Sequence, residues 1–221
     1  MRKSLFPATI LPALFLVTCG ATLHAQVKPE ISIRKIESAL VDTPQISAGA
    51  YRKQQPGAAR PTPWLEVDVN FERDEVSKDA AKFSDDLTVN FYILLNNAAL
   101  NEDKHPTLLT GTTTISDVPY GKGLHVAAFV SPQSMARYFD GKVPSTAQQA
   151  IVDVGVTISN ATGVIAISSS ESTEVAKQGK GWWESESGMT KVSGRVLEKS
   201  QTPFASLAWD YYLPSKSKAV N

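Results

Sequence analysis

The sequence is almost free of cysteine. Its single cysteine, Cys19, lies within the first 25 residues. That stretch has the order of a secretory leader, with a basic start, an apolar run over residues 5–17 and small residues up to Ala25. We therefore predict a cleaved signal peptide over residues 1–25, and a mature chain without a disulfide or a thiol. Small extracellular domains often depend on disulfides, so the core alone must stabilise this one.

Cys19 leaves a second route of processing open. The residues around it resemble a bacterial lipoprotein box, in which the cysteine is acylated and becomes the first mature residue, but Thr18 stands where glycine, alanine or serine is usual. The sequence favours cleavage after Ala25 over a lipid anchor at Cys19. Either route predicts export to the periplasm, the outer membrane or the cell surface.

An excess of charge of one sign is also missing. The chain has 22 basic and 22 acidic residues and no net charge. Such a balance gives no strong field to attract nucleic acid or an anionic membrane. After the leader no apolar run approaches the ~20 residues of a spanning helix, so we predict no membrane span in the mature protein.

Groups that carry catalysis are scarce. Beyond the leader the only histidines are His105 and His125, and no strand–turn–helix serine motif occurs. Glu102 and Asp103 beside His105 form one short cluster with metal-binding side chains, which is a weak signal without a second cluster. We predict no catalytic residue, no metal and no cofactor. A hydrolase with carboxylates on loops is the least favoured alternative.

Apolar and polar residues alternate through most of the chain, which is typical of strands with one face in a core and one in water. The predicted strands are residues 31–36, 64–72, 87–96, 111–118, 123–131, 151–160, 163–169, 190–198 and 204–213. Many short antiparallel strands of this kind predict a β-sandwich or a small barrel. The domain is expected to cover residues 26–214, followed by a flexible tail over residues 215–221.

Few segments favour a helix. Ser131 followed by Pro132 is typical of a helix start, and Gly141 can end that helix. A second short helical turn is predicted from Ser145, with Gln148 completing a capping box. The proline-rich residues 44–63 and the polar residues 171–190 are predicted to be loops.

Aromatic pairs supply the candidate binding surface. Neighbours on a strand point to opposite faces, so one of Trp182 and Trp183 is expected to be exposed, and exposed tryptophan is frequent in binding hot spots. The alternative is that one tryptophan fills the core and the other lies flat on the surface under a loop. Residues 204–213 place apolar side chains on both faces of the predicted last strand, more than a half-solvated strand needs. This favours contact with a second copy or a protein partner; the alternative is a central strand buried by the core and by the predicted helix at residues 131–140. The candidate partner or ligand residues are Trp182, Trp183, Trp209, Tyr211 and Tyr212.

Two segments carry a family resemblance. LTVNFYILLNNAAL (residues 87–100) and GLHVAAFVSPQSMARYFDG (residues 123–141), together with the exported start, resemble the immunoglobulin-like proteins encoded beside type IV pili in verrucomicrobial gut bacteria. This resemblance implies an immunoglobulin-like β-sandwich on or near the outer envelope and a role in pilus assembly or adhesion. It carries no catalytic residues. The chain differs from true pilins, because residues 31–36 read as a strand where a pilin has a long helix.

Taken together, the sequence predicts an exported, non-enzymatic envelope protein that supports assembly of a pilus-like appendage or adhesion, with protein partners or a homo-oligomer. The alternative is a carbohydrate- or ligand-binding module that uses the exposed aromatics of Trp182 and Trp183.

Overall fold

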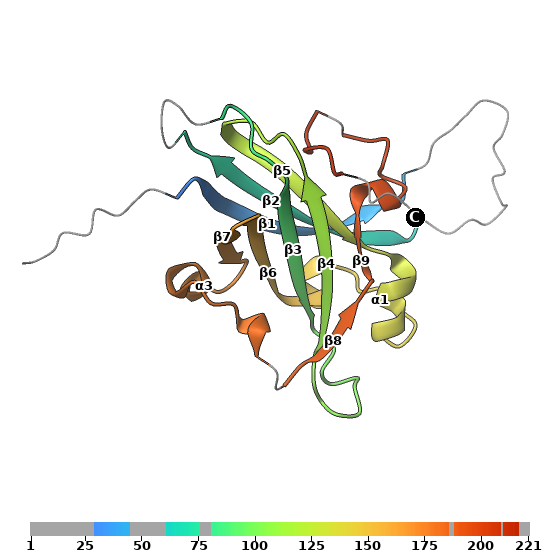
Figure 1. Ribbon diagram of the computed structural model, residues 1–221. Coiled ribbons are helices and arrows are strands. Elements are labelled where there is room, and N and C mark those ends of the chain that lie inside the picture. The colour runs from blue at the N-terminus through green and yellow to red at the C-terminus, as the bar shows by residue number, and fades with distance from the viewer. Residues whose placement is uncertain (1–28, 45–60, 76–80, 186–187, 209, 217–221) are drawn as a thin grey trace, which may run out of the picture.

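Two β-sheets packed face to face make up the protein (Figure 1). The computed structural model describes residues 29–44, 61–75, 81–185, 188–208 and 210–216. One sheet has the order β1 (Ile31–Asp42), β2 (Pro63–Arg73), β5 (Gly121–Val130), β9 (Val196–Glu198). The other has the order β7 (Gly163–Ser169), β6 (Ile151–Asn160), β3 (Leu87–Leu95), β4 (Thr107–Ile115), β8 (Thr190–Ser193). The predicted β-sandwich with few short helices is confirmed.

The first seven strands follow the strand order of an immunoglobulin sandwich. In that order β1, β2 and β5 correspond to strands A, B and E, and β7, β6, β3 and β4 correspond to G, F, C and C′. Neighbouring strands are antiparallel throughout, except that β8 runs parallel to β4. The last two strands, β8 and β9, extend one sheet each.

The alternating pattern predicted from the sequence forms the core. Val67 and Val69 of β2 and Val89 and Phe91 of β3 are fully buried between the sheets. The residues between them, such as Asp68, face outward on β2. Burying an aliphatic or aromatic side chain of this size stabilises the fold by roughly 1.5–3 kcal/mol. Burial of this row of side chains therefore supplies much of the stability that small extracellular domains often take from disulfides.

The chain between β5 and β6 forms two short helices. α1 (Pro132–Tyr138) begins as predicted, with the Ser131 hydroxyl accepting from the Ser134 amide. The second helix, α2 (Ala147–Ala150), begins one residue later than predicted, because Thr146 and not Ser145 caps it by accepting from the amide of Gln149. The side chain of Gln149 accepts in return from the amide of Ser145.

Residues 171–190 were predicted to be a loop, and this prediction is only partly right. Within them lie α3 (Thr173–Gln178) and the short 3-10 helix η1 (Trp182–Glu184). Both lie over the outer face of the five-stranded sheet, where Val175 and Trp183 pack on Leu108. Gly179 ends α3 with a φ of 65°, a left-handed conformation that glycine adopts without strain.

The prediction of one strand over residues 190–198 was wrong, because the chain changes sheets within it. β8 pairs with β4, and after Gly194 (φ 73°) and Arg195 the chain enters the other sheet as β9. The crossing passes close to β4, since a Cβ added at Gly111 would lie 2.5 Å from the Cβ of Val196. Glycine at position 111 therefore makes this connection between the sheets sterically possible.

The predicted last strand, residues 204–213, does not form. After the 3-10 helix η2 (Lys199–Gln201) the described residues run through turns, with Ala208 at a positive φ of 51°, and make only isolated bridges to His125 and Ile115. This removes the edge-strand argument for an oligomer, because the segment lies across its own four-stranded sheet. The predicted signal peptide, Cys19 and most of the predicted proline-rich loop lie outside the described residues.

Among the described residues, no helix is both long and apolar enough to cross a membrane.

Candidate interaction surfaces

Aromatic residues gather on the outer faces of both sheets. On the four-stranded sheet, Tyr211 and Tyr212 lie against His125 and two carboxylates, Glu66 and Asp68; we call these five residues the tyrosine cluster. On the five-stranded sheet, Trp182 and Trp183 lie against Tyr92 and form the tryptophan cluster. The two predicted aromatic pairs thus belong to opposite faces and do not form one surface.

Tyr211 is exposed and nevertheless fixed in position. Its ring stacks on the ring of His125 with centroids 4.1 Å apart, and its hydroxyl donates to Oδ2 of Asp68 at 3.1 Å. Tyr212 meets it edge to face at 4.8 Å. Tyr211 is still 49% exposed. A large side chain that is already ordered loses little entropy when it binds a partner, so the geometry suits molecular recognition.

His125 supports this arrangement from below. Its Nδ1 lies 3.0 Å from Oδ2 of Asp68, and Nδ2 of Asn70 lies 3.1 Å from its Nε2. An amide nitrogen can only donate, so Nε2 accepts from Asn70, and the Nδ1–H group donates to the Asp68 carboxylate. Both ring nitrogens are therefore occupied, and His125 is only 8% exposed. The arrangement serves positioning of Tyr211 and leaves no free nitrogen for acid–base chemistry.

Tyr212 binds the second carboxylate. Its hydroxyl donates to Oε1 of Glu66 at 2.8 Å. Burial raises the pKa of Glu66, the hydrogen bond from Tyr212 counteracts that rise, and the nearby charge of Asp68 adds to it. Burial also raises the pKa of the Tyr212 hydroxyl, and the acceptor Glu66 raises it further. At neutral pH the Tyr212 hydroxyl is thus protonated and donates its hydrogen bond to a half-buried carboxylate.

The segment that carries both tyrosines is attached along its length. The amide of Leu213 donates to the carbonyl of His125 at 2.9 Å, and the amide of Lys216 donates to the carbonyl of Thr114 at 2.8 Å. Upstream, the ring of Phe204 stacks on Phe129 with centroids 4.8 Å apart. These contacts hold the tyrosine cluster to the sheet although the segment has no regular structure.

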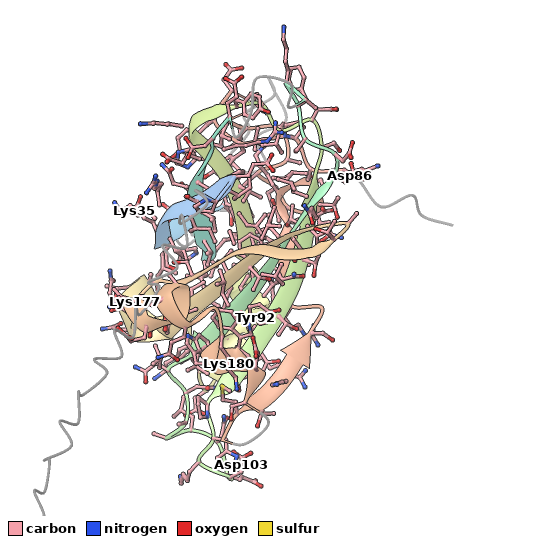
Figure 2. All side chains as sticks on the ribbon, turned by 60° about the vertical axis from the view of Figure 1, so that its left-hand side comes forward. Lys35, Asp86, Tyr92, Asp103, Lys177 and Lys180 are labelled. Atoms are coloured by element: carbon pink, nitrogen blue, oxygen red, sulfur yellow. The ribbon has the colours of Figure 1, made fainter. Side chains whose placement is uncertain are left out.

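Trp183 is a packing residue. It is 3% exposed and stacks on Tyr92, with ring centroids 4.7 Å apart and planes 12° apart. Its ring lies over Gly155 of β6, where a Cβ would come within 2.1 Å of ring carbons. Figure 2 shows α3 and the residues after it, marked by Lys177 and Lys180, over the sheet that carries Tyr92. Trp183 thus attaches this segment to the sheet and offers no ring face to a partner.

Trp182 is the half-buried member of the pair. It meets Trp183 edge to face at 5.2 Å, and its indole Nε1 donates to the hydroxyl of Ser169 at 3.1 Å. Ser169 in turn donates to the buried carboxylate of Asp153. Trp182 borders an open depression of about 490 Å³, whose other side chains are mostly polar. They include Glu174, Gln178, Lys180 and Glu184.

Trp209 and the cluster at residues 102–105 are the remaining candidates from the sequence. Trp209 lies outside the described residues. In the cluster at residues 102–105, the amide of His105 donates to Asp103 at 2.9 Å, which lowers the pKa of that carboxyl and stabilises an exposed turn. Within the described ranges no group of three or more histidine, cysteine or acidic side chains could hold a metal ion.

The sequence pattern alone did not reveal the residues that support Tyr211. The signal was present, because Glu66, Asp68 and Asn70 alternate along the outward face of β2, and His125 alternates outward on β5. What the sequence lacked was the register that sets Asn70 opposite His125.

Comparison with known proteins agrees with this architecture. A crystal structure of a protein from Akkermansia muciniphila, a verrucomicrobe, superposes with a TM-score of 0.69 at 20% sequence identity, covering 86% of this chain and 95% of that one. At this identity the likeness shows the fold alone. No curated protein matches the sequence. A protein-family model, in contrast, matches residues 22–219. This chain, with nearly all of its length after the predicted leader inside that match, is a member of the family that the model describes.

Proposed function

We propose that the protein is an exported, non-enzymatic envelope protein that supports pilus-like assembly or adhesion by binding a protein partner. The tyrosine cluster is the proposed binding surface. The observation that carries the proposal is Tyr211, a large exposed side chain held in one orientation by His125, Asp68 and Tyr212. Aromatic residues of this kind dominate the energy of many protein interfaces.

Further support comes from the residues around the cluster. Leu207 is 39% exposed on the same segment, so an apolar side chain accompanies the tyrosine. Glu66 and Asp68 give the surface an acidic character beside the aromatic rings. A partner of matching chemistry would present a basic and an apolar side chain together. The sequence resemblance to proteins encoded beside type IV pili, the family match and the verrucomicrobial relative favour an envelope setting.

The test is site-specific crosslinking in a bacterium that produces the protein. A photoreactive phenylalanine analogue at Leu207 is expected to capture an envelope protein, and Tyr211→Ala in the same molecule is expected to abolish that capture. The matched control places the analogue at Val164, which is 62% exposed on β7. Capture of nothing at Leu207 while the protein is folded and exported, or equal capture at Val164, would contradict partner binding through this surface.

Ligand binding at Trp182 is the second candidate function. The observation in its favour is the depression of about 490 Å³ that Trp182 borders together with carboxylate, amide and ammonium groups. Glycan-array screening of the wild type and of Trp182→Ala tests it. Binding that survives Trp182→Ala would exclude this depression as the site.

A further inference from the structure

A pocket of about 570 Å³ lies at the side of the sandwich where the chain crosses between the sheets. Its lining is partly polar and partly apolar and comes from β3, β4, the end of β8 with the turn after it, β9, η2 and Lys216. Its volume is in the usual range of small-molecule sites. It belongs to neither the tyrosine cluster nor the depression beside Trp182.

The pocket contains a short gap in the edge of β4. β8 pairs with this edge over residues 107–110, and the amide of Lys216 donates to the carbonyl of Thr114. Backbone groups of alternate residues point to the same side of a strand, so the N–H and C=O of Thr112 face the same edge, between the two paired regions. A gap of one residue is too short for an added peptide strand, and the backbone N–H and C=O of Thr112 face it.

Side-chain hydroxyls surround this gap. Thr110, Thr112 and Thr114 project from the outer face of β4 into the pocket, opposite Tyr92, Asn90 and Thr88 of β3. Within the described part of the chain the hydroxyls of Thr110 and Thr114 make no hydrogen bond, and that of Thr112 donates to Asn90 at 2.9 Å and keeps its capacity to accept. The pocket thus presents hydroxyl groups whose donors and acceptors are not used up inside the protein.

The aromatic and charged groups narrow the class of ligand. Tyr92 adds an aromatic ring that is fixed by its stack on Trp183. The ammonium of Lys216 is already paired with Asp86 at 2.7 Å, and the pocket also holds the carboxylate of Glu198. A phosphate or carboxylate ligand would therefore meet no uncompensated positive charge. A neutral ligand rich in hydroxyl groups, with C–H bonds to set against a ring, fits this lining best.

We propose that this pocket binds a neutral sugar unit, such as an unsubstituted or N-acetylated hexose, with its hydroxyl groups on the threonines of β4 and on Asn90 and Gln201, and with its ring beside Tyr92. The inference is independent of the partner-binding proposal, because the tyrosine cluster is on the opposite sheet.

The experiment follows backbone amide shifts of the full mature protein by NMR. The probes are methyl β-glucoside, methyl β-galactoside and N-acetylglucosamine, each titrated to millimolar concentration. At least one probe is expected to shift the amides of residues 110–114 and 193–194 in a saturable manner. Inorganic phosphate and acetate at the same concentrations are expected to leave these amides unchanged.

Two variants locate the site. Thr110→Val/Thr112→Val keeps the shape and strand propensity of β4 and is expected to weaken sugar binding by tenfold or more. Thr88→Val, on the same sheet face but outside the pocket lining, is the matched control and is expected to bind as the wild type does. Trp182→Ala should also bind normally, which separates this pocket from the depression beside Trp182.

Saturation by none of the three sugars, or binding that the double valine variant leaves intact, would overturn the proposal. Shifts with phosphate in place of sugar would equally refute it, by showing an anion site. Capture of a protein at Leu207 is unaffected by any of these outcomes, so the two proposals fail separately.

Discussion

At the scale of single residues, Tyr212 tests how the tyrosine cluster is held together. Tyr212→Phe removes the donor from a half-buried carboxylate, Glu66, and is expected to lower the free energy of unfolding at neutral pH by about 1–2 kcal/mol. Without that hydrogen bond the pKa of Glu66, already raised by burial, rises further. A raised pKa means stability that is present below the unfolded value of about 4.3 and lost as pH rises through the folded value. The difference between variant and wild type should therefore shrink as the pH falls through the raised folded pKa values of Glu66, and its pH-dependent part should be gone by about pH 4.

The measurement is urea unfolding at several pH values. Tyr120→Phe is the matched control, because the buried hydroxyl of Tyr120 has no hydrogen-bond partner among the described residues. It is expected to be neutral or slightly stabilising. A Tyr212→Phe variant as stable as the wild type at neutral pH would show that the bond to Glu66 contributes little.

Gly155 tests the packing of the tryptophan cluster. In Gly155→Ala the new methyl group would overlap the ring of Trp183, which must move off the sheet. Overpacking of this kind usually costs about 1–3 kcal/mol. We expect the free energy of unfolding, measured with urea, to fall by about 1–3 kcal/mol or more. Tryptophan fluorescence is expected to shift to the red. Ser168→Ala on the neighbouring β7 serves as control, and an unchanged spectrum in Gly155→Ala would show that Trp183 is not packed there.

At the scale of elements, the end of the irregular C-terminal segment at Lys216 is expected to be held less firmly in acid. The ammonium of Lys216 lowers the pKa of Asp86 through their hydrogen bond. A lowered pKa means stabilisation that is present above the unfolded value of about 3.9 and lost as the pH falls through the folded value. The protection of the Lys216 amide against hydrogen exchange, measured relative to its intrinsic rate at each pH, should therefore decrease below about pH 4. In Asp86→Asn that protection should be at the lower level at every pH. An Asn variant that still shows the acid transition would assign it to another group.

Comparison of the predicted with the observed elements shows which of them the sequence pattern identifies. Alternation predicted the strands that supply the core, because burial of one face imposes a period of two, and Ser131 with Pro132 marked the first helix correctly. The pattern over residues 204–213 was apolar in the same way, yet those described side chains pack as individual anchors, such as Phe204 on Phe129 and Tyr211 on His125. Apolar content alone does not distinguish a strand from a segment lying on a sheet.

Long-range geometry accounts for the sites that the sequence did not reveal. The pocket at β4 depends on the crossing of residues 190–198 between sheets, and the positioning of Tyr211 depends on the register of β2 against β5. Both features join residues far apart in the chain, for which local pattern carries no information. The sequence allowed one tryptophan of the pair to fill the core but did not show that it is Trp183, since its partners Tyr92 and Gly155 come from two other strands.

At the scale of the whole molecule, stability should be independent of redox conditions. If the leader is removed after Ala25, the mature chain holds no cysteine. Unfolding curves with and without reductant are then expected to coincide. In cells, Cys19→Ser should be exported and processed as the wild type is, and neither form should incorporate labelled palmitate. Labelling of the wild type that Cys19→Ser abolishes would establish the lipid anchor instead.

The late position of β8 and β9 in the chain has a consequence for the time course of synthesis. Every strand of the sandwich through β7 is complete by residue 169, whereas the strand that covers the edge of β4 begins at residue 190 (Figure 1). A nascent or truncated chain therefore passes through a stage in which a nearly finished sandwich still has an open strand edge, the kind of edge that pairs with other chains. Chaperone dependence should thus be concentrated in this interval, and chains stopped just before residue 190 should aggregate more than chains stopped after residue 216.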